Sequence, residues 1–363
     1  MQKNKTKYDR IYVCHTFYNV YVTLLKECNR PKEEQGRADI ALSKMSTDFG
    51  NLKEQLEACG MFRKVHILDE RKASDFPELA KYQKSHNNVV WHMVNRIILT
   101  KKHPQKMEPY ITIDFKQYRD IYVYCDWDPI GWYLSYKHIY YHAMEDGLDC
   151  LKYLDGARYE NRGHFGLKAF LAKRNIIFIQ NGYGKYCLDM EVNDRSVLKY
   201  DYEKYVEVPR KPLELALSDS QRKMILKVFM PDAGQFMEEL GNKAKDGNCM
   251  LFLSQPHPRS LEARIQICKD IIRDYAKGCH VVIKPHPRDT VDYETLFPEC
   301  TVIKGKFPIE VLNFIEGTHF KLAISIVTTA LDTIDFADEK INLGQSFWDA
   351  YEDPELHNYN AAI

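Results

Sequence analysis

The chain has 363 residues, which exceeds the roughly 250–300 residues at which a single hydrophobic core stops growing, so two domains are expected. Lys plus Arg and Asp plus Glu each number 51, and this zero formal net charge argues against nucleic-acid binding as the main function. The ten cysteines include no Cys-x-x-Cys pair, which favours a cytoplasmic protein with reduced thiols over a disulfide scaffold or a zinc site. Neither a signal peptide nor a membrane span of ~18 apolar residues is expected.

Short strand patterns alternate with helical patterns in residues 1–205, which predicts an α/β domain with a parallel sheet. The expected strands are 11–15, 38–43, 64–68, 120–127 and 176–182, and the expected helices lie near 18–27, 50–59 and 86–100. Residues 206–246 are charged, helical and interrupted by prolines, and we interpret them as a linker.

The alternation becomes more regular in residues 247–345. The expected strands are 249–254, 280–284, 301–304, 321–327 and 340–344, with helices near 260–276, 289–296, 308–315 and 328–336. Strands about 20–30 residues apart fit the βα units of a doubly wound sheet. The sequence therefore predicts a second Rossmann-like domain, followed by a tail over 346–363.

The tetrapeptide Pro-His-Pro-Arg occurs at 256–259 and again at 285–288, each time just after a predicted strand. Ligands of open parallel sheets bind at the carboxyl ends of the strands. In the second copy the prolines restrict the backbone on both sides of His286, and Lys284 and Arg288 add positive charge. Such a rigid, cationic turn suits a phosphate, although an ordinary surface loop would look similar.

Three further features belong to the same half of the chain. Asp289 or Thr290 is expected to cap the following helix. Thr328 and Thr329 would stand at a helix N-terminus, where hydroxyls and backbone N–H groups can bind an anion or merely cap the helix. Glu310 would lie in a first helical turn, where it could bind a ribose diol or only complement the helix dipole.

Two acidic patterns occur in the first half. Glu145 and Asp146 precede Gly147, and one of these carboxylates could act as a general base, although Glu-Asp-Gly is also a common turn. Asp126 and Asp128 form an Asp-x-Asp at a strand end, a pattern that can hold a divalent metal but also arises by chance.

The order of these motifs is more specific than any one of them. It runs Glu-Asp-Gly (145–147), Ser-Gln-Pro (254–256), Lys-Pro-His-Pro-Arg-Asp (284–289), Phe-Pro-x-Glu (307–310) and Thr-Thr (328–329). This order resembles the bacterial sialyltransferases, namely the lipooligosaccharide sialyltransferase and capsular polysialyltransferase families. Those families carry an acidic-acidic-Gly motif, a His-Pro motif and a downstream Ser-Ser or Ser-Thr motif. The resemblance is best over 249–332 and patchy in the first half.

The resemblance implies a GT-B fold, in which two Rossmann-like domains face each other across a cleft. It implies an inverting, metal-independent transfer of sialic acid from CMP-sialic acid to a glycan hydroxyl, with no cofactor and no nucleic-acid partner. The acceptor would be a galactose- or sialic-acid-terminated surface glycan of lipopolysaccharide or capsule. A cytoplasmic location is implied, and peripheral association with the inner face of the membrane is compatible with it.

Carried over residue by residue, the resemblance assigns the donor site mainly to the second domain. His286 would contact the donor phosphate and support the departure of CMP, Thr328 and Thr329 would hold the same phosphate, and Glu310 would bind the ribose. The other donor-binding residues would be Ser254, Gln255, Pro256, Lys284 and Pro287. His257 in the first Pro-His-Pro-Arg copy is expected to be incidental.

The resemblance also supplies candidates for the base that deprotonates the acceptor. Glu145 ranks first and Asp146 second. Glu262 ranks third, because the acidic motif of the lipooligosaccharide branch lies shortly before the His-Pro motif. Two other interpretations stay open: a glycerophosphotransferase that uses CDP-glycerol, and a non-catalytic transferase-like protein.

Overall fold

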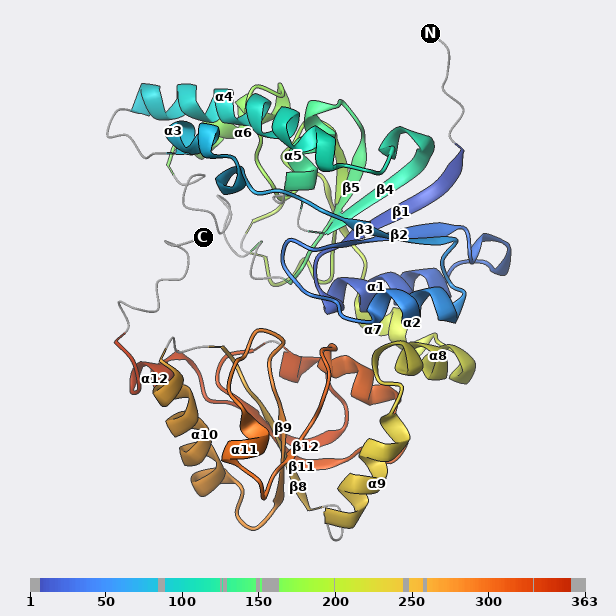
Figure 1. Ribbon diagram of the computed structural model, residues 1–363, viewed down its shortest axis with the longest axis vertical. Helices are drawn as coiled ribbons and strands as arrows, with labels where there is room; N and C mark the ends of the chain where they lie inside the picture. The colour runs from blue at the N-terminus through green and yellow to red at the C-terminus, as the bar shows by residue number, and fades with distance from the viewer. Residues whose placement is uncertain are drawn as a thin grey trace. The chain divides into compact units, whose positions relative to one another are not determined.

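The computed structural model describes residues 7–83, 89–124, 126, 129–147, 151, 163–198, 200–243, 248–256, 260–328 and 330–353. They form two compact units, Met1–Leu217 and Ser218–Ile363, each with its own parallel sheet (Figure 1). The prediction of an α/β protein with two Rossmann-like domains is confirmed. No helix in the described part of the chain is long and apolar enough to cross a membrane.

The sheet of the first unit has the strand order β3-β2-β1-β4-β5-β6-β7, and every neighbouring pair is parallel. The strands are β1 (Tyr8–Cys14), β2 (Ala38–Ser43), β3 (Lys64–Leu68), β4 (Tyr118–Tyr124), β5 (Tyr141–Met144), β6 (Cys187–Val192) and β7 (Tyr205–Glu207). Along the chain, β2 and β3 are added on one side of β1, and β4 to β7 are then added on the other side of β1. The switch point, where such sheets bind ligands, therefore lies between the carboxyl ends of β1 and β4.

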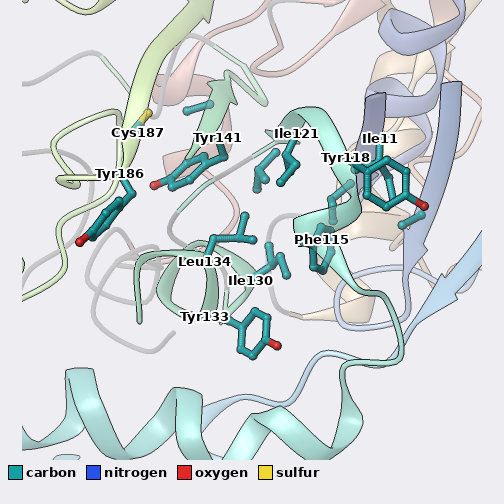
Figure 2. Packing of buried hydrophobic residues seen from close by; sticks show 14 of the residues in the cluster. Ile11, Phe115, Tyr118, Ile121, Ile130, Tyr133, Leu134, Tyr141, Tyr186 and Cys187 are labelled. Carbon is teal, nitrogen blue, oxygen red and sulfur yellow. The ribbon is translucent and has the colours of Figure 1, made fainter. Parts of the chain in front are cut away.

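Helices cover both faces of this sheet (Figure 1). One face carries α1 (Phe17–Cys28), α2 (Leu52–Cys59) and α7 (Arg210–Leu215), and the other carries α3 (Ala80–Gln83), α4 (Val89–Met107), α5 (Pro129–Tyr136) and α6 (Phe165–Lys173). Figure 2 shows part of this core, where Ile130 and Leu134 of α5 lie near Ile121 and Tyr141 of the strands, and Ile11 lies beside Tyr118. Burial of these side chains stabilises the packing of α5 on the sheet and so holds in place the strand ends, where the polar residues lie.

The sheet of the second unit has the order β10-β9-β8-β11-β12, again fully parallel. Its strands are β8 (Cys249–Leu253), β9 (His280–Lys284), β10 (Thr301–Val302), β11 (Phe320–Ser325) and β12 (Ala337–Asn342). Its helices are α8 (Asp219–Phe229), α9 (Ala233–Lys243), α10 (Leu261–Tyr275), α11 (Tyr293–Leu296) and α12 (Gln345–Asp349), with 3₁₀ turns η9 (Ile309–Phe314) and η10 (Ala330–Asp332). By the same reasoning, the switch point lies between β8 and β11.

The strand predicted over 176–182 is absent, and this prediction was wrong. The run is apolar because Ile177, Phe178 and Ile179 are buried, but its backbone does not join the sheet. Asn181 and Gly182 have left-handed backbone conformations, and their amides donate to the carboxylate of Asp126 instead of to a strand. The sheet is completed by β5, β6 and β7, which are short and were not predicted.

The segment interpreted as a linker contributes to both units, because β7 and α7 belong to the first and α8 and α9 to the second. Within the segment interpreted as a tail, Trp348 of α12 is buried in the core of the second unit. The helix predicted over 328–336 is only the single 3₁₀ turn η10.

Candidate functional site

Two loops at the carboxyl edge of the second sheet are tied together by Ser254. This buried residue follows β8, and its hydroxyl donates to Asp289 at 2.7 Å. The same hydroxyl accepts a hydrogen bond from the backbone N–H of His286 at 3.1 Å. The structure thus brings together the Ser-Gln-Pro and His-Pro motifs, which lie about one βα unit apart in the chain.

Asp289 is the centre of this arrangement. Its side chain is fully buried and also accepts from Arg264 and from the hydroxyl of Tyr293, each at 2.8 Å. The prediction that Asp289 or Thr290 caps the next helix was wrong, because Asp292 caps α11. The carboxylate of Asp289 instead fixes the His-Pro turn against β8 and α10, and removing it would leave buried donors unsatisfied.

His286 is held in a defined orientation by its own turn. Its carbonyl accepts from the N–H of Asp289 at 2.8 Å, and its Nδ1 accepts from the N–H of Arg288 at 3.1 Å. With Nδ1 as an acceptor, a neutral imidazole carries its proton on Nε2. The ring is only partly buried, so Nε2–H can serve as a donor toward an anion at the edge of the sheet.

Lys284 lies inside the unit, with 5% of its surface exposed. Its ammonium group donates to the carbonyls of Pro285 and Gly305, each at 3.3 Å, and sits 4.4 Å from the ring centre of Phe307. Burial lowers the pKa of Lys284 to about 8. This lysine joins the loops that follow β9 and β10, so its contribution to a binding site is to hold their backbones in place.

The ends of β8 and β11 are joined across the switch point. Gln255 accepts from the N–H of Val327 at 3.1 Å and donates back to the Val327 carbonyl. Thr328 follows, partly exposed, and its hydroxyl accepts from the N–H of Ala330 at 3.1 Å. Thr328 therefore contacts the first residue of η10, while Thr329 lies outside the described residues.

The remaining donor-site candidates lie in neighbouring loops. Glu310 is in the first turn of η9, is buried, and accepts from the hydroxyl of Thr333, just after η10, at 2.9 Å. This contact places Glu310 beside the loop that carries Thr328. Pro256 and Pro287 are both partly exposed.

The carboxyl edge of the first sheet carries the acidic pair. Glu145 follows β5 and is 2% exposed, and its Oε2 has no hydrogen-bond partner in the described structure. Burial raises the pKa of Glu145 to about 7, against the opposing effect of the Arg210 guanidinium. Asp146 is only partly buried and accepts from the hydroxyl of Thr16 at 3.1 Å and from the side-chain amide of Asn19.

Asn19 connects Asp146 to the start of α1. Its side-chain oxygen accepts from the backbone N–H groups of His15 and Thr16, at 2.8 and 3.0 Å. His15 in turn donates from Nε2 to Glu70 at 2.7 Å, and both side chains are buried. The roles of Asn19 and Glu70 were not predicted, although Thr-x-x-Asn before an apolar run is a recognisable capping pattern.

Two weaker candidates have other structural roles. Asp126 is fully buried and accepts from the amides of Asn181 and Gly182 and from Tyr141, at 2.6, 3.2 and 3.1 Å. Burial raises the pKa of Asp126 to about 6. The two carboxylate oxygens of Asp126 therefore hold the 180–182 loop in place, so Asp126 has a structural role. Asp128, the other residue of the Asp-x-Asp pattern, lies outside the described residues. No group of three or more His, Cys, Asp or Glu that could hold a metal occurs among the described residues.

Glu262, the third candidate base, is exposed in the first turn of α10. Its carboxylate accepts from the Ser260 hydroxyl at 2.8 Å. Hydrogen bonds from its own backbone amide and from Ser260 lower the pKa of Glu262, which makes it a weaker base than a free glutamate.

The raised pKa of Glu145 gives a testable stability difference. Between its ordinary value near 4.5 and about 7, the folded chain keeps a proton that the unfolded chain loses, so this residue contributes stability at low pH that is lost as pH rises toward 7. Glu145→Gln should therefore be more stable than wild type near pH 8, on the order of 1–3 kcal/mol, with a smaller difference near pH 5. Urea unfolding at both pH values measures this, and an equal effect at both would contradict the assignment.

Several known proteins are similar to this chain. An uncharacterized protein from Haemophilus influenzae is 34% identical over 95 residues, which are 25% of this chain and 30% of that protein, so the match spans under a third of the relative. The α/β-galactoside α-2,3-sialyltransferase of Photobacterium phosphoreum is structurally similar, with a TM-score of 0.55 and 13% identity over 94% of this chain and 91% of that one. The GT-B domain of a Photobacterium damselae sialyltransferase has a TM-score of 0.46 and 14% identity over 90% of this chain and 88% of that one.

The Photobacterium phosphoreum structure shares the fold with this chain, in agreement with the predicted GT-B class. A family model provides the more specific result. The model described as glycosyltransferase family 52 matches residues 80–343, which include most of both units and all the motifs on which the resemblance rests. The chain therefore belongs to glycosyltransferase family 52, and the prediction that it is a glycosyltransferase is confirmed.

Proposed function

We propose that the protein is an inverting, metal-independent sialyltransferase that uses CMP-sialic acid as donor. The observation that carries this proposal is the junction of Ser254, His286 and Asp289 at the carboxyl edge of the second sheet. It presents a partly exposed imidazole donor close to the switch point, where an open parallel sheet binds its ligand. Membership of glycosyltransferase family 52 supports the reaction class, and the fold shared with a galactoside sialyltransferase is compatible with the donor.

Departure of CMP requires stabilisation of negative charge on one phosphate. His286 Nε2–H would donate to a phosphate oxygen as charge grows on it, and the hydroxyls of Thr328 and Thr329 would support the same group. Glu310, in the first turn of η9 and in contact with Thr333 after η10, would accept from the ribose hydroxyls. Because the leaving group is a monophosphate ester, this mechanism needs no metal ion to neutralise a diphosphate.

The acceptor hydroxyl must lose a proton, and the structure favours Asp146 over Glu145 for this step. Asp146 is partly exposed, and the donors Thr16 and Asn19 hold it in one orientation at the N-terminus of α1. Glu145 is almost fully buried, so we assign it an electrostatic role beside Arg210 rather than direct contact with the acceptor.

The acceptor is proposed to be a galactose- or sialic-acid-terminated glycan of lipopolysaccharide or capsule. The reaction is proposed to take place in the cytoplasm, at the inner face of the membrane. No cofactor and no nucleic acid take part in this proposal.

The donor assignment can be tested by titration calorimetry of the whole chain with CMP, CMP-sialic acid and CDP-glycerol. We expect saturable binding of CMP and CMP-sialic acid, unchanged by EDTA, and much weaker binding of CDP-glycerol. Binding of CDP-glycerol in preference to CMP would replace the proposal with a glycerophosphotransferase. Binding of no cytidine nucleotide would point to a non-catalytic role.

A further inference from the structure

Four large apolar side chains on two helices of the first unit are strongly exposed. Val90 and Trp91 at the start of α4 are 69% and 60% exposed, and Leu167 and Phe170 of α6 are 58% and 49% exposed. We refer to these four residues as the α4–α6 patch. Exposed apolar residues are common singly, but a group of this kind beside a basic surface indicates an interaction site.

The two helices share one supporting core. Met93 and Ile97 of α4 and Ala169 and Ala172 of α6 all belong to the cluster around Ile177 and Ile179. Figure 1 shows α4 and α6 on the same side of the first sheet. The helices are therefore neighbours, and their inward faces are already occupied.

The exposed residues of α6 form a helical stripe that points away from this core. In α6, Leu167, Phe170 and Arg174 are spaced three and four residues apart, which places them on one face, different from that of Ala169 and Ala172. The free energy for burial of a leucine or phenylalanine side chain is about 1.5–3 kcal/mol, so this stripe has a strong tendency to be covered.

The sign of the charge on the two helices indicates which kind of surface would cover the α4–α6 patch. Over residues 89–107 and 165–174 the chain contains no Asp or Glu, although the whole protein has 51 acidic residues. The basic residues there are Arg96, Lys101, Lys102, Lys106, Lys168, Lys173 and Arg174. Of these, Lys168 is buried and Lys106 pairs with Glu78 at 2.6 Å. The Arg174 guanidinium lies 3.4 Å from the ring centre of Phe170, so charge and apolar surface are in direct contact. Lys173 pairs with Glu203 at 3.2 Å, but exposed pairs of this kind are weak.

We propose that the α4–α6 patch binds the surface of a lipid bilayer that carries anionic headgroups. Aromatic and aliphatic side chains flanked by Lys and Arg are the composition of helices that lie in a membrane interface. Phe170, Leu167 and Trp91 would enter the boundary between headgroups and acyl chains, while Arg174 and Lys173 would contact the phosphates. The proposed membrane contact rests on the proposed function, in which the enzyme works at the inner face of the membrane.

The test is flotation of the purified full chain with two kinds of vesicle, one of phosphatidylcholine and one of phosphatidylcholine with phosphatidylglycerol. Binding is expected only to the vesicles with phosphatidylglycerol, and it should weaken as salt is added. Leu167→Ser with Phe170→Ser should lower the affinity about tenfold or more. Lys173→Gln with Arg174→Gln should have a similar effect, because each basic residue near the surface contributes about fivefold. Leu188→Ser is the matched control, since Leu188 is also 49% exposed but lies on β6.

Release of CMP from CMP-sialic acid is measured on every variant, which separates this inference from the donor assignment. Unchanged CMP release with lost vesicle binding supports the patch. Equal vesicle binding by wild type and both double variants would overturn it, and so would the absence of binding to anionic vesicles. If light scattering shows a wild-type dimer that the Leu167→Ser/Phe170→Ser variant loses, the patch binds a second copy of the chain instead.

Discussion

His286→Ala is expected to lower the turnover of CMP-sialic acid by about a hundredfold to a thousandfold. The imidazole is the partly exposed donor of the Ser254–Asp289 junction, and loss of one donor from a site that stabilises growing negative charge typically has this effect. Steady-state release of CMP measures the change. The effect should fall mainly on kcat, because the donor is needed most as the phosphate leaves.

Two variants control for this result. His257→Ala alters the other Pro-His-Pro-Arg copy and should be mild, since that histidine is expected to be incidental. His286→Gln can place a side-chain amide where Nε2–H would be, so it should retain more activity than His286→Ala. If His286→Ala keeps full turnover, or if His257→Ala is the severe change, the phosphate assignment is wrong.

Asp146→Asn is expected to lower transfer to the acceptor by about a hundredfold to ten-thousandfold, which is the usual contribution of a general base. The amide has the same shape and can still contact Thr16 and Asn19, but it cannot take up the proton of the acceptor hydroxyl. Transfer is measured as kcat/KM across a range of pH. Donor binding by calorimetry should be unchanged, because the residues that we propose to bind the donor lie in the second unit.

Glu145→Gln is the matched comparison for this prediction. Because Glu145 is buried and only adjacent to the partly exposed carboxylate of Asp146, its replacement should lower transfer less than Asp146→Asn. A larger loss of transfer for Glu145→Gln than for Asp146→Asn would favour Glu145 as the base, which is the ranking expected from the sequence. Full transfer in both variants would exclude the pair and leave Glu262 as the candidate.

The sequence predicted much of the fold because several strands are short buried runs with clear boundaries. β2, β3 and β9 have the bounds expected from the sequence, and the βα rhythm of the second half correctly indicated a Rossmann-like sheet. The segment 176–182 failed because an apolar run shows that residues are buried but not where their backbone N–H groups bond. Two of those N–H groups bond to Asp126, some 55 residues earlier in the chain.

The candidate site could likewise be predicted from the sequence only in part. Motif order suggested Ser254, His286 and Glu310 as candidates, and the structure places them at one edge of the second sheet or in its loops. Sequence reasoning could not show that Asp289 is a buried hub rather than a cap, because its partners Ser254 and Arg264 lie 35 and 25 residues away. The link from Asn19 to Asp146 spans 127 residues and could only come from the folded structure.

The most direct test of the central claim is to incubate the purified full chain with CMP-sialic acid and follow the reaction by NMR in the presence of EDTA. We expect release of CMP and sialic acid even without an acceptor, with loss of this activity in His286→Ala. Intact CMP-sialic acid after prolonged incubation, together with turnover of CDP-glycerol under the same conditions, would contradict the proposed sialyltransferase activity.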